Sequence, residues 1–225
     1  MGTLTFNNNA MKPILMTTVF FMLAVTSCAA PRKMISKSTI KLEGKNTNIR
    51  DLIEIDGYYQ ATTIDGKRTG MIFFEDGSCC SFVFKEDVTE DMKRRNLSQM
   101  IESWEQKGQI RWGFYWGVYK IDKDTIVSQT VERYGIFSMP WSFDELKYEV
   151  IDNRTLKLIY QKSLYPADIH DMKKDHYEIS EKNIIDTFVP ANSLPSSDNW
   201  LKEEKWIWRF EQDWKEYLWK IKLKR

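Results

Sequence analysis

The sequence predicts an all-β fold: an eight-stranded antiparallel barrel with one inserted helix and a C-terminal helix. Two Asp-Gly pairs, at residues 65–66 and 76–77, separate short runs of alternating apolar and polar residues, a pattern typical of hairpin turns. Residues 110–121 alternate over an unusual length and return through a turn at 122–124 as a second strand. Gly113 and Gly117 inside that stretch indicate a bend or a close approach, as in a barrel wall. A two-sheet sandwich is the alternative, and the order of strand pairing distinguishes the two.

The eight strands are expected in sequence order. They cover approximately residues 56–64, 68–75, 78–85, 110–121, 125–133, 144–151, 154–161 and 183–190. Most of their connections are short, so strands that are neighbours in the sequence are expected to pair in up-and-down order. Closure of such a sheet leaves no unpaired edge.

The period of the sequence changes between residues 87 and 107. Leu97, Met100, Ile101 and Trp104 recur at helical spacing, and Gly108 follows as a plausible residue after the helix end. This predicts an amphipathic helix at about 90–107, inserted between the third and fourth strands. Its apolar face either packs in the core or covers a pocket as a lid.

The C-terminal tail is rich in tryptophan. Five of the nine tryptophans lie at positions 200, 206, 208, 214 and 219, and apolar residues recur at helical spacing from about Glu211 onward. The tail either docks on the barrel or lies in a lipid interface, where tryptophan and lysine are favoured. Burying a large apolar side chain stabilises a fold by about 1.5–3 kcal/mol, which favours docking.

Strand alternation leaves open which face of residues 110–121 points into the barrel. One face carries Trp112, Phe114, Trp116 and Val118, which would fill the interior. The other carries Gly113, Tyr115, Gly117 and Tyr119, which would leave room and hydroxyl groups. The candidate ligand-pocket residues are therefore the aromatic residues of the expected strands, namely Tyr59, Phe73, Phe82, Phe84, Phe114, Tyr115, Trp116 and Tyr119.

The N-terminal region resembles a bacterial lipoprotein signal. Met11-Lys12 precedes an apolar run at 13–24, and the run ends in Val25-Thr26-Ser27-Cys28, which resembles a lipobox. The resemblance implies lipidation of Cys28 and cleavage before it; an uncleaved signal anchor is the alternative. The expected organisation is a signal peptide at 1–27 with Met11 as an alternative start, a lipidated N-terminus and flexible tether at 28–50, and the barrel domain with its tail at 51–225.

Charge and motifs exclude several classes of function. The chain has 33 Lys and Arg against 32 Asp and Glu, and removing Lys12 with the leader leaves 32 against 32, so no nucleic-acid partner is expected. No phosphate loop, nucleophile elbow or metal-binding motif is present, and His170 and His176 lie in a polar stretch without a convergent ligand pattern.

Cys79 and Cys80 are expected to be free thiols on opposite faces of a strand; a vicinal or an intermolecular disulfide is the alternative.

Three segments carry a family resemblance. They are the opening at 57–59, the turn segment at 73–77 and the hairpin from Trp116 to Ile126. Together with the lipobox they resemble the lipocalin-like domains of Gram-negative lipoproteins over residues 55–190. True lipocalins open with Gly-X-Trp, and Tyr59 stands where that tryptophan would be. The resemblance implies a small barrel that binds a hydrophobic molecule. No Asp follows Cys28 directly, so the resemblance also implies the outer rather than the inner membrane. No acidic run follows either, which implies that the protein faces the periplasm.

Two functions follow as expectations. The first is a membrane-anchored lipoprotein whose barrel binds a small hydrophobic or aromatic ligand. The second is a structural or protein-interaction lipoprotein whose barrel is filled by side chains. No catalytic residue, cofactor or metal site is expected, and the predicted partners are the membrane, through lipid on Cys28, and the small ligand.

Overall fold

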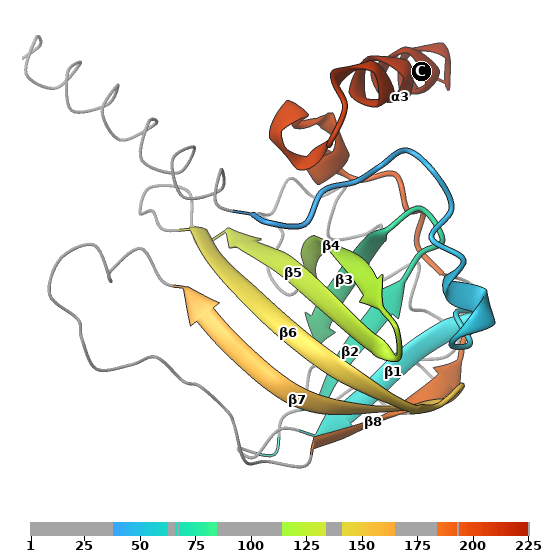
Figure 1. Cartoon of the computed structure of the whole chain (residues 1–225), viewed down its shortest axis with the longest axis vertical. Helices are drawn as coiled ribbons and strands as arrows, with labels where there is room; N and C mark the ends of the chain where they lie inside the picture. Colours follow the sequence, from blue (N-terminus) through green and yellow to red (C-terminus); the bar gives the residue numbers. More distant parts are fainter. Residues whose placement is uncertain are drawn as a thin grey trace, which may run out of the picture. The chain divides into compact units, whose positions relative to one another are not determined.

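The eight strands close into one antiparallel barrel in sequence order (Figure 1). The computed structural model describes residues 38–62, 66, 68–84, 114–133, 141–164, 184–192 and 194–224. The strands are β1 (Gly57–Thr62), β2 (Arg68–Phe73), β3 (Ser78–Val83), β4 (Phe114–Asp122), β5 (Thr125–Arg133), β6 (Trp141–Asp152), β7 (Thr155–Leu164) and β8 (Ile184–Pro190). β1 pairs with both β2 and β8, which closes the sheet. The predicted barrel is confirmed and the sandwich is excluded, whereas the helix expected at 90–107 lies outside the described residues.

Two tight turns form as their residues predict. Gly77 has a φ of 88° in the turn between β2 and β3. Asp76 supports that turn, because its Oδ1 accepts hydrogen bonds from the Ser78 backbone N–H at 3.0 Å and from Ser78 Oγ at 2.6 Å. In the turn between β4 and β5, Lys123 adopts the left-handed conformation at a φ of 58°. These turns set the register of the hairpins.

The face of β4 that carries glycine and tyrosine points into the barrel. Tyr119 packs in the interior with residues of β1, β2 and β6, whereas Trp116 and Val118 pack in a separate cluster on the outside. A Cβ added to Gly117 would lie 2.3 Å from the Gln129 carbonyl oxygen, so β4 and β5 approach closely at this position. Of the two faces of β4 that could point inward, the face with Gly117 and Tyr119 does so.

One half of the barrel interior is filled by aromatic rings. Phe73 lies at its centre and makes edge-to-face contacts with Tyr59 at 6.1 Å, Tyr119 at 5.3 Å and Tyr148 at 6.2 Å between ring centroids. The 3-10 helix η1 (Ile49–Asp51) places Ile49 in the same cluster. We call this half, where η1 lies, the closed end of the barrel.

A second cluster lies on the outer face of β1 to β5. Strand residues on this face include Tyr58, Ile72, Cys80, Phe82, Trp116 and Val127. Ile40 and Leu42 cover it from the N-terminal side, and Leu201 and Ile207 from the C-terminal side. Both faces of this part of the sheet are therefore buried, and Cys79 and Cys80 are free thiols on opposite faces, as predicted.

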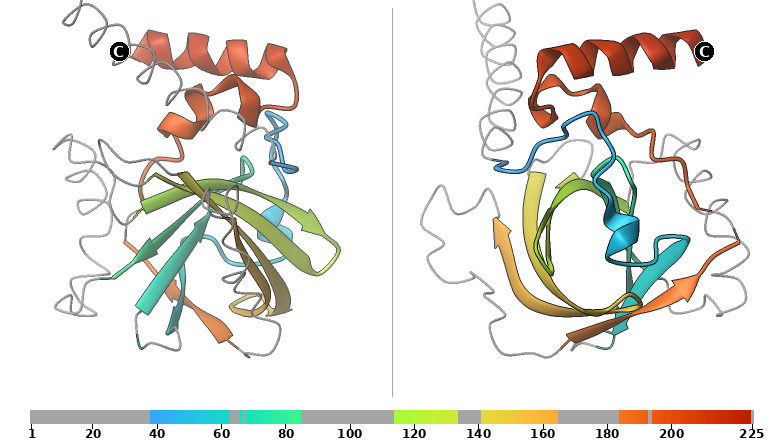
Figure 2. Two further views of the ribbon diagram at one scale, coloured as in Figure 1. Left: turned by 90° about the vertical axis from the view of Figure 1, so that its left-hand side faces the viewer. Right: turned by 45° about the vertical axis from the view of Figure 1, so that its right-hand side comes forward.

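The covering segments hold each other. The Leu42 N–H donates to the Ile207 carbonyl at 2.8 Å, and the Arg209 N–H donates to the Leu42 carbonyl at 2.8 Å. The tail continues through η3 (Trp200–Glu203), η4 (Lys205–Ile207) and α3 (Glu211–Lys224). Figure 2 shows α3 lying over the short helices rather than directly on the strands. Residues 38–50, expected as part of a flexible tether, instead contribute buried residues to both clusters.

Candidate functional site

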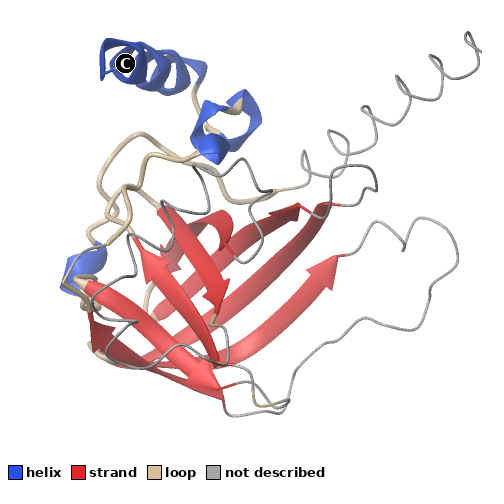
Figure 3. Cartoon of the chain, turned by 180° about the vertical axis from the view of Figure 1, so that it is seen from behind, coloured by secondary structure: helices blue, strands red, loops and turns tan. Residues whose placement is uncertain are grey.

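Strand direction places the connections after β1, β3, β5 and β7 at one end of the barrel. The connections at this end are 63–67, 84–113, 134–140 and 165–183, whereas those at the closed end are 74–77, 123–124 and 153–154. Viewed from behind, the strands run between these two ends (Figure 3). We call the end where β1, β3, β5 and β7 finish the open end. In antiparallel barrels, loops at one end of a rigid wall are the usual place for binding.

A cavity of about 210 Å³ occupies the barrel interior towards the open end. All eight strands contribute to its wall. Its apolar lining is Ala61, Met71, Val83, Leu146, Leu158 and Ile184. Its polar lining is Thr69, Ser81, Tyr115, Thr130, Asp144, Tyr148, Gln161 and Asp186, with Gly70 completing the wall. A mixed wall of this kind suits a ligand that has an apolar body and a polar group.

Asp186 is the most unusual residue of this wall. It lies at an inward position of β8, between the inward Ile184 and Phe188, and only 5% of its surface is exposed. Within the described part of the chain no hydrogen bond or ion pair reaches its carboxylate. Burial raises the pKa of Asp186 to about 7, because the charged form loses its hydration. A carboxyl group in this state can bind a cation when ionised or donate a proton when neutral.

Tyr148 forms the floor of the cavity. Its ring contacts Phe73 of the closed-end cluster, and its side chain also lines the cavity. Burial raises the pKa of Tyr148 well above its ordinary value, and the nearby charge of Asp186 adds to the effect. The phenol therefore stays neutral at ordinary pH.

The candidate residues from the sequence fall into three places. Tyr115 lines the cavity. Tyr59, Phe73 and Tyr119 lie below its floor in the closed-end cluster. Phe82, Phe84 and Trp116 lie in the outer cluster. The side chain of Phe114, together with Cys28, His170 and His176, lies outside the described residues.

Sequence reasoning missed the two carboxylates of the cavity. Asp186 sits at an inward position of β8 between Ile184 and Phe188, and Asp144 at an inward position of β6. Residues 184–188 alternate Ile, Asp and Phe on one face, so a charged residue on an apolar face was the available signal. That signal indicates a buried carboxylate only if this face of β8 points into the barrel.

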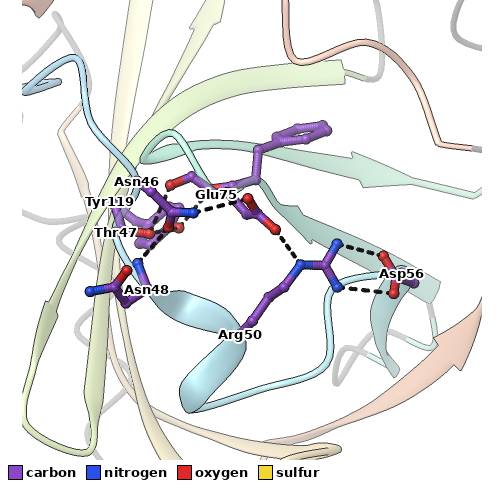
Figure 4. Close-up of polar contacts among 8 residues, drawn as sticks. Asn46, Thr47, Asn48, Arg50, Asp56, Glu75 and Tyr119 are labelled. Atoms are coloured by element: carbon purple, nitrogen blue, oxygen red, sulfur yellow. Dashed lines mark hydrogen bonds and ion pairs between the residues drawn. The ribbon is translucent and has the colours of Figure 1, made fainter.

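The closed end is sealed by polar contacts (Figure 4). The Tyr119 hydroxyl donates to the Phe74 carbonyl at 2.6 Å and lies 2.6 Å from Thr47 Oγ1. Arg50 forms a two-pronged ion pair with Asp56, at 3.0 and 2.8 Å, and a further pair with Glu75. These contacts tie residues 47–56 to the turn after β2.

An ion pair between a buried lysine and a partly exposed aspartate fastens the tail to the same turn. Lys202 Nζ lies 2.5 Å from Asp76 Oδ2, and the lysine side chain is only 4% exposed. Burial would raise the pKa of Asp76, but the charge of Lys202 and the hydrogen bonds from Lys202 and Ser78 outweigh it and hold that pKa below its ordinary value. The smaller hollow beside this pair, of about 170 Å³, lies between the turn and α3. Lys202 in the wall of this hollow is already paired with Asp76, so we assign the ion pair a structural role.

Comparisons with known proteins find no relative: no family model, no curated protein and no solved structure matches the chain. Among the described residues, no group of three or more His, Cys, Asp or Glu side chains is placed to hold a metal ion. In that same part of the chain, no helix has the length and apolar character needed to cross a membrane.

Proposed function

We propose that the protein is a lipid-anchored, lipocalin-like envelope protein whose barrel binds one small molecule in the open-end cavity. The cavity itself carries the proposal, because all eight strands line it and side chains leave it unfilled. An apolar cavity of about 150 Å³ holds benzene. A cavity of about 210 Å³ therefore suits one ring with a short substituent better than a long acyl chain.

The alternative is a structural lipoprotein with a filled barrel. The closed half of the barrel fits the description of a filled interior, since five aromatic rings from different strands pack together there. The open half does not, because Ser81, Thr130 and Ala61 face the interior with small side chains. The two functions differ in whether the open half of the barrel binds a small molecule. We propose that it does, and that the role is binding without catalysis.

Ligand binding is tested by filling the cavity. In the Ala61→Phe variant the added ring occupies the space near Asp186, so affinity for benzene, toluene and indole should fall at least tenfold in ligand-observed NMR titrations. The matched control is Thr62→Phe, which places the same side chain at the exposed neighbouring position of β1. If the wild-type protein binds none of these compounds, or Ala61→Phe binds them as tightly as wild type, the binding function is wrong.

Anchoring is tested at Cys28. The proposal places the protein in the outer membrane, facing the periplasm, through lipid on that cysteine. The Cys28→Ser variant should leave the membrane fraction and fail to incorporate labelled palmitate, while the unmodified chain does both. A serine variant that still incorporates palmitate and sediments with membranes would contradict the anchor.

A further inference from the structure

We propose that the ligand is a cation: a small molecule with an aromatic or apolar body and a protonated nitrogen, for which Asp186 is the counter-ion. This inference rests on the proposed binding function and narrows its ligand class. It is carried by the placement of Asp186 and by the charge of the cavity as a whole.

The first observation is a buried carboxylate that no described residue balances. Asp186 lines the cavity at 5% exposure, and within the described chain neither a hydrogen bond nor an ion pair satisfies it. Carboxylates are almost never buried unless they are paired, because removing one from water is costly. A ligand that brings a positive charge would complete the site.

The second observation is the sign of the surrounding charge. Asp144 of β6 lines the same cavity, and none of the described residues in the wall is Lys, Arg or His. An anionic ligand such as a fatty acid would meet two carboxylates in a space of low dielectric, where like charges repel strongly. The rings of Tyr115 and Tyr148 line the same space, and aromatic rings attract cations. The wall therefore discriminates in favour of cations.

The third observation is that, among the described side chains of the barrel interior, Asp144 is the one other carboxylate that could compete with Asp186 for the charge of the ligand. The titratable side chains that share the barrel interior with it are Tyr59 from β1, Cys79 from β3, Tyr115 and Tyr119 from β4, and Asp144 and Tyr148 from β6. β2, β5 and β7 add none among the side chains that the structure describes. Burial raises the pKa values of Tyr59, Cys79, Tyr119 and Tyr148, which keeps these groups neutral at ordinary pH.

The pH dependence of binding follows from this arrangement. The pKa of Asp186 is raised to about 7, so below that pH the carboxyl is mostly protonated in the free protein. A protonated amine prefers the ionised form. Its affinity should therefore rise between pH 5.5 and pH 8, with at least a tenfold gain, while the affinity of a neutral analogue of the same shape does not.

The test compares three compounds that differ mainly in charge. Phenethylamine is the cation, 2-phenylethanol the neutral analogue and 3-phenylpropanoate the anion, each titrated by calorimetry into the full chain at pH 8. Phenethylamine should bind at least ten times more tightly than 2-phenylethanol, and 3-phenylpropanoate should bind most weakly. In Asp186→Asn, phenethylamine should lose at least tenfold in affinity and its pH dependence, while 2-phenylethanol changes less than twofold.

The variant keeps the experiment interpretable. Asparagine has the shape of aspartate and removes a buried charge that no described residue balances, so Asp186→Asn should melt at a temperature equal to or higher than wild type at pH 8. If wild type binds the three compounds equally and the variant changes nothing, the cation inference is overturned while the binding function stands. If none of the three binds wild type, and benzene, toluene and indole fail as well, the binding function falls with it.

Discussion

Deleting residues 206–225 should lower the free energy of unfolding by about 4 kcal/mol and create a surface that binds apolar dyes. Ile207 is 1% exposed and packs on the outer cluster, with Trp206 and Trp208 partly buried against it. Fully burying one such side chain contributes about 1.5–3 kcal/mol. The deletion also removes both backbone hydrogen bonds to Leu42. The measurement is chemical denaturation of the deleted and intact chains.

A shorter deletion is the matched control. Removing residues 211–225 takes away α3, which contacts the rest through Trp214 and Tyr217, but leaves η3 and η4 on the barrel. Its cost should be about 1–2 kcal/mol, because the residues lost are mostly half-exposed or exposed. Trp219 and Leu223 are 63% and 68% exposed, and lie one helical turn apart. If the longer deletion keeps its melting temperature and loses only liposome binding, the tail is a membrane contact.

Replacing Gly117 by valine should destabilise the barrel by about 3 kcal/mol or more. A Cβ at this position would lie 2.3 Å from the Gln129 carbonyl oxygen and 2.8 Å from Thr130 Cα. Both are backbone atoms of the paired strand, so no side-chain rotation can relieve the contact, and overpacking of this kind costs about 1–3 kcal/mol or more. Thermal unfolding followed by circular dichroism measures the effect.

The matched control for Gly117 lies on the same strand. Lys120 is exposed on β4, so Lys120→Val changes one outward side chain and should alter stability by less than about 0.5 kcal/mol. If Gly117→Val unfolds at the same temperature as Lys120→Val, β4 and β5 can separate at residue 117 without cost, and their close approach does not contribute to stability.

Local residue chemistry was enough to predict most of the barrel. Gly77 requires a left-handed conformation and Asp76 caps the turn, so the hairpin of β2 and β3 could be placed from a few adjacent residues. The return of the chain after Asp122 followed in the same way. Up-and-down pairing then led to closure between β1 and β8, because a sheet of this length otherwise leaves two edges.

The inward face could not be predicted, because both faces of β4 are buried. Trp116 is 1% exposed and Tyr119 is 3% exposed, although they point in opposite directions. Alternation identifies the inside only when the outside meets water. Here the outside is covered by residues more than 70 positions away on either side, such as Leu42 and Ile207. The expected tether up to residue 50 was misleading for the same reason: Ile40 and Leu42 have no local periodicity and are ordered by distant partners.

The cavity could be anticipated only in outline. Tyr115 was among the candidates, but Asp144 and Asp186 belong to β6 and β8, which flank β7, and they line one cavity only in the folded sheet. A carboxylate on an apolar strand face has no local explanation. Its meaning depends on which residues surround it, and those come from all eight strands.

Closure of the barrel also constrains when folding can finish. Tyr59 pairs with Phe188, so the first strand must wait for the last, and ordering so long an intervening chain carries a large entropy cost. Leu201 and Ile207 help to cover Trp116 and Ile72, and they are synthesised later than β8. During synthesis, the outer cluster therefore stays open to solvent until residue 207 has emerged. The exposed sheet in that interval is the state most in need of protection from aggregation.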